Sequence, residues 1–432
     1  MPPRPSEHED VVPASEKTEP PLTETVAPQP VASLPAQRQS WPDASIPETQ
    51  QPSATPPTPP PPPARKSSSK HATNLYVVSY LVLFSILGTL ARLGLQALTF
   101  YAGAPVVTGV LWANVAGSLV MGFLMEDKNL FREEWGTTQR NETAEWKDAH
   151  EAHEHAKRHA AVKKTIPLYI GLTTGFCGSL TSFSSFMRDV FLALANALPD
   201  PSLPVGASIA PRNGGYSFMA LVAVILITVA LSLSALIAGA HSALALTWMT
   251  PTMPFALTRR VVDPAVVVLA WGCWLGAVFL AIWPPDRHDP GREVWRGRAV
   301  MALVFAPLGC LLRFSASLRL NSRIPAFPLG TFVVNIFGTI IEGMCYDLQR
   351  VPGLGAGGAS HWIGCQVLQG VMDGFCGTTT TVSTWVAELN ALSRRRHAYV
   401  YGVTSVGVAL GFLVVIMGSL LWTRGWTDPV CG

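Results

Sequence analysis

Two apolar segments of this chain are interrupted by the same unusual run of glycine, serine and threonine. The first reads Gly175-Phe-Cys-Gly-Ser-Leu-Thr-Ser-Phe-Ser-Ser-Phe186, and the second reads Gly374-Phe-Cys-Gly-Thr-Thr-Thr-Thr-Val-Ser-Thr-Trp385. These residues are poor helix formers. At membrane depth, non-helical backbone is tolerated only where protein or an aqueous path covers it. One copy would be typical of close helix packing, but two matched copies predict a binding site between repeats.

The composition predicts an integral membrane protein. Only 14% of the 432 residues are charged and 49% are hydrophobic, whereas soluble domains carry about 25% charged residues. A net charge of +3 is too small to indicate a nucleic-acid partner. The seven cysteines are scattered and do not predict a disulfide framework. Walker, Rossmann and HExxH motifs are absent from any fitting context, so we expect neither an enzyme nor an organic cofactor.

Nine apolar segments reach the roughly 20 residues that a spanning helix needs. They lie near 75–100, 105–125, 165–195, 216–246, 264–283, 299–320, 327–346, 362–390 and 398–422. Lys and Arg are concentrated on one set of connecting loops, with the 286–298 loop as the exception. The positive-inside rule therefore places the N-terminus in the cytosol and, after nine crossings, the C-terminus outside.

The chain also contains an internal repeat. Gly88 and Asn114 return as Gly309 and Asn335, an offset of 221 in both cases (309 − 88 and 335 − 114), whereas the glycine breaks are offset by 199 (374 − 175). The difference is an insertion in the charged 126–164 loop of the first half. Each half then has four spans, and the single span between them inverts the second half. We expect an all-α polytopic membrane protein with nine transmembrane helices, two inverted four-helix repeats joined by a linker helix, and a broken third helix in each repeat.

This pattern divides the chain into four parts. Residues 1–71 form a Pro-rich cytosolic tail whose composition predicts disorder. Residues 72–248 form the first repeat, 249–297 the linker helix with its loops, and 298–432 the second repeat. Four histidines in the 126–164 loop have acidic and basic neighbours, which favours a solvated charged helix over a metal site.

Amides and aromatic rings at membrane depth are the first candidates for the site. Asn114 and Asn335 lie mid-span, where an amide can donate to an anion or bond a neighbouring helix. Phe183 and Phe186 share one helix face. Their electropositive ring edges can face an anion, although such pairs usually serve packing.

Hydroxyl groups beside the rings supply further donors. They belong to Thr181, Ser184, Thr380 and Ser383, and a polar track on the ninth span adds Tyr401 and Ser405. A path of neutral donors binds an anion weakly enough to release it. The carbonyls freed by a broken helix would instead suit a small hard cation.

Three charged residues of the spans allow two interpretations each, and a fourth allows one. Arg92 and Arg313 either hold an anion in a vestibule or extend to the membrane surface. Asp373 is either a functional acid or a neutral, hydrogen-bonded carboxyl. Glu342 lies toward the outer end of its span, and we expect it to reach the surface.

From about residue 75 to the end, the sequence resembles the fluoride channel family, called Fluc or CrcB. It looks most similar to the family's single-chain eukaryotic fluoride exporters (FEX) of the fungal type. The family pattern G-x-x-G-x-x-T-[TS]-F-S-[TS]-F is complete from Gly175 to Phe186. In the second copy, Val382 and Trp385 stand at the two ring positions.

The resemblance implies a passive fluoride-selective channel that exports fluoride from the cytosol across the plasma membrane. A fluoride/proton antiporter using Asp373, or another coupled small-ion transporter, is the alternative. The chain would act in the lipid bilayer as a monomer with an internal pseudo-dimer. Asn114 and Asn335 would line fluoride pathways, and the departures at Val382 and Trp385 put one of the family's two pores in doubt.

The resemblance also implies roles for the aromatic rings and the backbone carbonyls of the breaks. Phe183, Phe186 and Trp385 would form the box of rings that fluoride passes. A central structural Na⁺ would be held by backbone carbonyls, those of Gly178, Thr181, Gly377 and Thr380.

Overall fold

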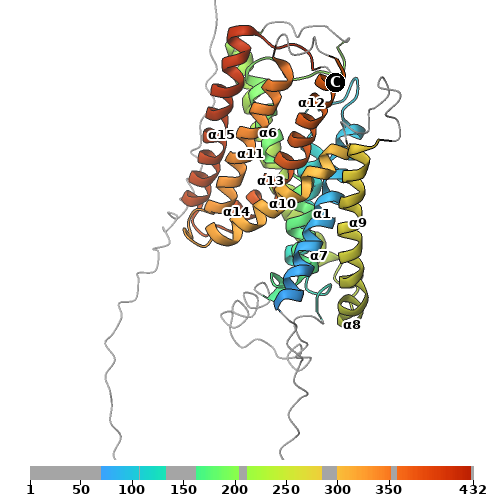
Figure 1. Cartoon of the computed structure of the whole chain (residues 1–432). Coiled ribbons are helices and arrows are strands. Elements are labelled where there is room, and N and C mark those ends of the chain that lie inside the picture. The colour runs from blue at the N-terminus through green and yellow to red at the C-terminus, as the bar shows by residue number, and fades with distance from the viewer. Residues whose placement is uncertain are drawn as a thin grey trace, which may run out of the picture. The chain divides into compact units, whose positions relative to one another are not determined.

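The computed structural model describes residues 70–106, 108–132, 162–203, 212–284, 299–351 and 358–429, all within the unit Lys66–Gly432. Every regular element in these ranges is a helix (Figure 1). Residues 1–69 of the predicted tail, and residues 133–161 of the charged loop, lie outside the described residues, whereas Lys70 and His71 begin the first helix.

Each apolar segment expected from the sequence is helical in the structure. The first half comprises α1 (Lys70–Thr99), α2 (Leu111–Glu126), a divided third segment with α4 (Pro167–Ile170), the π-helix η1 (Gly171–Cys177), α5 (Gly178–Leu180) and α6 (Phe183–Leu194), and then α7 (Gly214–Ala245). The linker comprises α8 (Phe255–Leu257), the π-helix η2 (Thr258–Val262) and α9 (Asp263–Ile282). The second half comprises α10 (Met301–Leu320), α11 (Leu329–Arg350), a divided segment with α12 (Gly358–Gly370), the π-helix η5 (Val371–Cys376), α13 (Gly377–Thr379) and α14 (Ser383–Ala391), and then α15 (Arg395–Arg424).

Six helices within the described ranges are long and apolar enough to cross a membrane. They are His71–Thr99 of α1, α7, Phe255–Ile282 around α9, α10, α11 and α15. The α2 helix is apolar but has only 16 residues, and both third segments are divided. The structure therefore confirms an α-helical membrane protein.

Glycine allows the closest helix contact, between α2 and α7. A Cβ on Gly122 would collide with the carbonyl of Leu236, and a Cβ on Gly239 would collide with the carbonyl of Leu119. Small residues are the usual means of such approach between apolar helices. In the second half, α11 packs against α15, where Gly343 faces the side chain of Leu413.

The third segments bring the two halves together. The α6 helix of the first half contacts α11 and α15 of the second half, and α14 of the second half contacts α2 and α7 of the first. Because each segment packs against the opposite half, the two breaks meet in the interior. Residues from both halves therefore build one shared site.

The linker helix α9 packs against α1 and α10 (Figure 1). Trp271 donates to Ser79 at 3.2 Å and Trp274 donates to the Val304 carbonyl at 3.0 Å. Most of its other face, including Val268, is exposed and apolar, as expected of a helix against lipid.

Candidate functional site

The two breaks have the same local structure. A π-helix and one short turn end at Thr181 in the first half, and at Thr380 in the second, where the backbone becomes extended (φ −90°, ψ 147° and φ −93°, ψ 155°). A new helix, α6 or α14, follows within three residues. The predicted broken third helix is thus present in both halves, and most residues of the two breaks are buried, with Phe176, Phe375 and Thr384 partly exposed.

The two asparagine side chains hydrogen-bond to the backbone of the breaks. Asn114 accepts a hydrogen bond from the Ser182 amide at 2.8 Å and donates to the Ser182 carbonyl at 3.4 Å. Asn335 makes the matching pair with Thr381, at 2.9 and 3.3 Å. Both asparagines are fully buried. Each side chain therefore replaces backbone bonds that a continuous helix would have supplied.

This arrangement removes the helical donors of the carbonyls within the breaks. In an unbroken helix the Ser182 amide would donate to Gly178, four residues earlier; it donates to Asn114 instead. The Thr381 amide is diverted from Gly377 to Asn335 in the same way. These two carbonyls are therefore left without the donor that helical geometry would give them.

The carbonyls of Thr181 and Thr380 lose their helical donors as well. The amides that would reach them belong to Ser185 and Thr384, and both donate to side-chain hydroxyls of the breaks, at 3.2 and 3.4 Å. All four carbonyls predicted to hold a cation are thus freed from helical hydrogen bonding. Such oxygens are ligands that a small hard cation accepts, so the residues fit the predicted ion.

Each break also caps the helix that follows the other break. The Thr181 hydroxyl accepts from the Ser383 amide at 3.1 Å and lies 3.0 Å from the Ser383 hydroxyl. The Thr380 hydroxyl accepts from the Ser184 amide at 3.0 Å and lies 3.1 Å from the Ser184 hydroxyl. The four predicted hydroxyls therefore form two buried pairs, Thr181 with Ser383 and Thr380 with Ser184, and each pair joins the two halves.

Aromatic rings border these hydroxyl pairs. Phe183 and Trp385 meet edge to face with ring centroids 5.3 Å apart, and Phe183 meets Phe186 at 5.7 Å. The indole N–H of Trp385 is buried and has no hydrogen-bond partner among the described residues. A Cβ on Gly402 would lie 3.9 Å from the Trp385 ring, so α15 runs beside this pair of rings.

The predicted polar track on α15 lies on the same side. Tyr401 and Ser405 are fully buried. The Tyr401 hydroxyl donates to Glu388 at 2.8 Å, and Thr331 and Asn321 donate to the same carboxylate at 2.7 and 3.2 Å. Glu388 was not among the residues predicted from the sequence. An acid within a spanning segment is itself a signal of a functional site.

The expectation that Glu342 reaches the surface is wrong. Its side chain is fully buried, accepts a hydrogen bond from Ser184 at 2.6 Å and pairs with Arg188 at 2.8 Å. A buried carboxylate needs such a partner to offset its desolvation. Arg188 lies on another helix and was not selected from the sequence.

Arg92 and Arg313 point into the interior and reach the breaks. Arg313 donates to the Thr174 carbonyl at 2.7 Å, and Arg92 donates to the Asp373 carbonyl, at the equivalent position of the other break. A Cβ on Gly178 would collide with the Arg313 guanidinium. Both arginines are almost fully buried, so neither extends to the membrane surface.

Comparison with known proteins gives a consistent result. The family model described as "CrcB-like protein, Camphor Resistance (CrcB)" matches residues 79–240 and 300–419. A protein of Neurospora crassa named Fluoride export protein 1 is 56% identical over 377 residues, covering 84% of this chain and 70% of that protein. A protein of the same name from Candida albicans is 34% identical and covers 81% of each chain.

A bacterial protein matches a shorter part of the chain. The Fluoride-specific ion channel FluC of Pseudomonas paraeruginosa is 34% identical over 136 residues, which is 31% of this chain and 99% of that protein. No solved structure matches this chain.

Proposed function

This chain belongs to the CrcB family, and from that premise we propose that it is a passive channel that exports fluoride across the plasma membrane. Its relatives are named as fluoride export proteins and fluoride-specific channels. Fluoride is then the transported substrate, and the protein is a transporter rather than an enzyme. A passive path needs no coupling machinery, because an inside-negative potential drives an anion outward with about 2.3 kcal/mol per 100 mV.

The observation that carries this proposal is the buried indole N–H of Trp385, which has no partner among the described residues. A buried donor without a partner costs free energy that a bound anion would recover. Near it are the edge-to-face ring of Phe183 and the hydroxyl pair of Thr181 and Ser383. Together they offer neutral donors to a dehydrated fluoride and hold it weakly enough for release.

The two halves are proposed to be inverted repeats with nine membrane crossings in all. Support comes from contacts that occur in both halves. Asn114 and Asn335 bond the backbone of their own breaks, and Arg313 and Arg92 donate to the break of the opposite half. Such a chain acts as a monomer, because its two halves form an internal pseudo-dimer. Its N-terminus is cytosolic and its C-terminus extracellular. Cys365 of α12 is disulfide-bonded, as expected on the oxidising, extracellular side.

We propose that a central Na⁺ stabilises the breaks. It would be held by the four freed carbonyls of the breaks, those of Gly178, Thr181, Gly377 and Thr380. Its charge would compensate the carbonyl dipoles that no amide satisfies.

The two pores are proposed to be unequal. The pore that conducts has Phe183 with Trp385 and the α15 track of Tyr401 and Ser405. The other has Phe186 with Val382, which offers no ring edge to an anion. On its side, Tyr216 of α7, where that track would begin, is largely exposed.

A fluoride/proton antiporter is the competing proposal, with Asp373 as its proton site. This carboxylate accepts a hydrogen bond from the Gln369 side chain at 2.7 Å, which also suits a structural role. Proteoliposomes loaded with potassium fluoride separate the two proposals. With a potassium ionophore, a fluoride electrode should record rapid efflux at equal pH, and chloride should stay inside. Efflux that requires a proton gradient and disappears in Asp373→Asn would refute the channel.

A further inference from the structure

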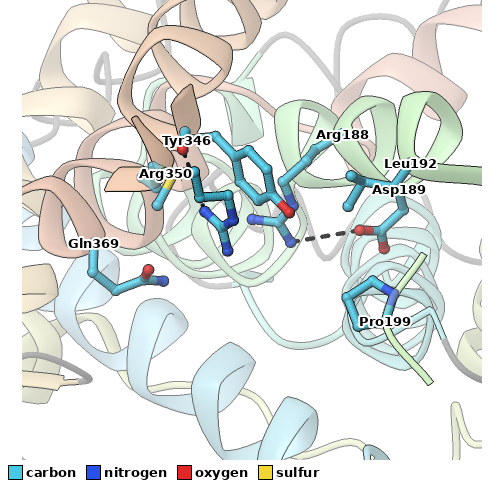
Figure 2. Close-up of a pocket in the computed structure, with 8 residues that line it drawn as sticks. Arg188, Asp189, Leu192, Pro199, Tyr346, Arg350 and Gln369 are labelled. Atoms are coloured by element: carbon cyan, nitrogen blue, oxygen red, sulfur yellow. Dashed lines mark hydrogen bonds and ion pairs between the residues drawn. The ribbon is translucent and has the colours of Figure 1, made fainter. Parts of the chain in front are cut away.

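A cavity of about 200 Å³ opens where α6, α11 and α12 come together. It is lined by Arg188, Asp189, Leu192, Pro199, Tyr346, Arg350, Gln369 and Met372. Figure 2 shows the guanidinium groups of Arg188 and Arg350 on either side of the Tyr346 ring. With the C-terminus outside, this cavity lies on the extracellular side of the breaks.

The lining carries two guanidinium groups and one carboxylate. Arg188 is 3.5 Å from Asp189. Arg350 lies over the Tyr346 ring at 3.5 Å and donates to the Tyr346 carbonyl at 3.3 Å. Within the described residues Arg350 forms no ion pair. Its charge is therefore the one most available to an anion in the cavity.

A chain of polar contacts joins this cavity to the hydroxyl pair of Ser184 and Thr380. The Ser184 hydroxyl donates to Glu342 at 2.6 Å, and the other oxygen of Glu342 accepts from Arg188 at 2.8 Å. Ser184 in turn contacts Thr380 at the breaks. Arg188 thus lies at the border between this buried hydroxyl pair and the cavity.

The repeat lacks this cluster on its other side. At the same offsets, Met121 stands in place of Glu342, Ala387 in place of Arg188 and Asn129 in place of Arg350. Packing of the fold therefore does not require these charges. They occur only beside α15, where the track of Tyr401 and Ser405 lies.

We propose that this cavity is a binding site for a small monovalent anion, where fluoride leaving the conducting pore regains water before release. This inference rests on the proposed function. A volume of 200 Å³ holds about six waters at ~30 Å³ each. Arg188 and Arg350 attract the anion, and Asp189 keeps the binding weak enough for exit.

Chloride is the probe that separates this site from the pore. Guanidinium groups in an open, hydrated cavity bind small anions with little selectivity, whereas the buried pore is proposed to pass fluoride only. Chloride supplied on both membrane faces in place of gluconate should therefore slow fluoride efflux without itself crossing. Wild-type efflux that is the same in chloride and gluconate would overturn the proposal.

The matched variants are Arg350→Gln and Arg424→Gln. Arg424 is an exposed arginine at the end of α15 and does not line the cavity. Loss of the Arg350 charge should lower fluoride efflux up to about fivefold, the scale of a partly exposed charge interaction, and should abolish the slowing by chloride. Arg350→Lys should restore both, and Arg424→Gln should change neither. Size-exclusion profiles like the wild type establish that the variants are folded.

Two other results would be decisive. Equal behaviour of Arg350→Gln and Arg424→Gln, with fluoride efflux intact, would overturn the anion site but leave the channel standing. A wild-type protein that passes no fluoride would overturn the proposed function, and this inference with it.

Discussion

Replacing Trp385 by Phe removes the donor on which the proposed pathway depends while keeping an aromatic ring. The Trp385 indole N–H is buried without a partner in the described structure, so its removal breaks no protein hydrogen bond. If the N–H donates to fluoride in transit, the variant loses one hydrogen bond to a charged group, about 1.5–3 kcal/mol. If the loss raises the rate-limiting free-energy barrier by the same amount, fluoride flux decreases by roughly 10- to 150-fold.

Efflux from proteoliposomes, measured with a fluoride electrode at equal protein density, tests this magnitude. The control is Trp274→Phe, which removes an indole N–H that donates to the Val304 carbonyl between α9 and α10. That variant should lose stability but keep its fluoride flux. If Trp385→Phe conducts as well as Trp274→Phe, the unpaired indole N–H of Trp385 does not donate to fluoride in transit.

Four further outcomes are expected. Phe183→Ile should remove nearly all fluoride flux and Phe186→Ile little, and comparable partial losses in both folded variants would rule out a single conducting pore. Deleting residues 1–71 should leave liposome flux intact, since that composition contributes no packing; a truncated protein that inserts but does not conduct would contradict this. Thr380→Ser should keep most of the flux, because it preserves the hydroxyl and the backbone ligand, and severe loss would count against the proposed Na⁺ site. Burial lowers the pKa of Lys163 from 10.5 to about 8, so the unfolded chain binds more protons above pH 8 and the free energy of unfolding should rise with pH up to about 10.5. A melting temperature that falls between pH 8 and 9.5, or an equal rise in Lys163→Met, would contradict this.

The breaks were predictable because their signal is local. Glycine and hydroxyl residues stand side by side within apolar segments, and the repeat supplies its own second example. The structure accordingly has extended backbone at Thr181 and Thr380. The helical segments were predictable for the same reason, since a long apolar run in a membrane has few alternatives to a helix.

Contacts between distant parts of the chain were not predictable. Glu342 looked like a residue near a helix end, and only the packing of α6 against α11 shows that Arg188, 154 residues earlier, is its partner. For Arg313 the sequence allowed two interpretations equally, an anion site in a vestibule or a side chain that extends to the membrane surface. Its partners are carbonyls of the two breaks, those of Thr174 in the opposite half and Thr378 in its own half. A residue's position along a membrane span indicates its depth in the membrane but not which neighbour its side chain contacts.

The central claim is that fluoride moves passively through this protein, and the equilibrium distribution of fluoride across a liposome membrane tests it most directly. A potassium gradient with ionophore sets the potential, pH is equal on both sides, and internal and external fluoride are measured once flux has stopped. A passive channel predicts that the fluoride concentration ratio changes tenfold for each ~59 mV of imposed potential. A ratio that ignores the potential and instead follows an imposed pH difference would contradict the account.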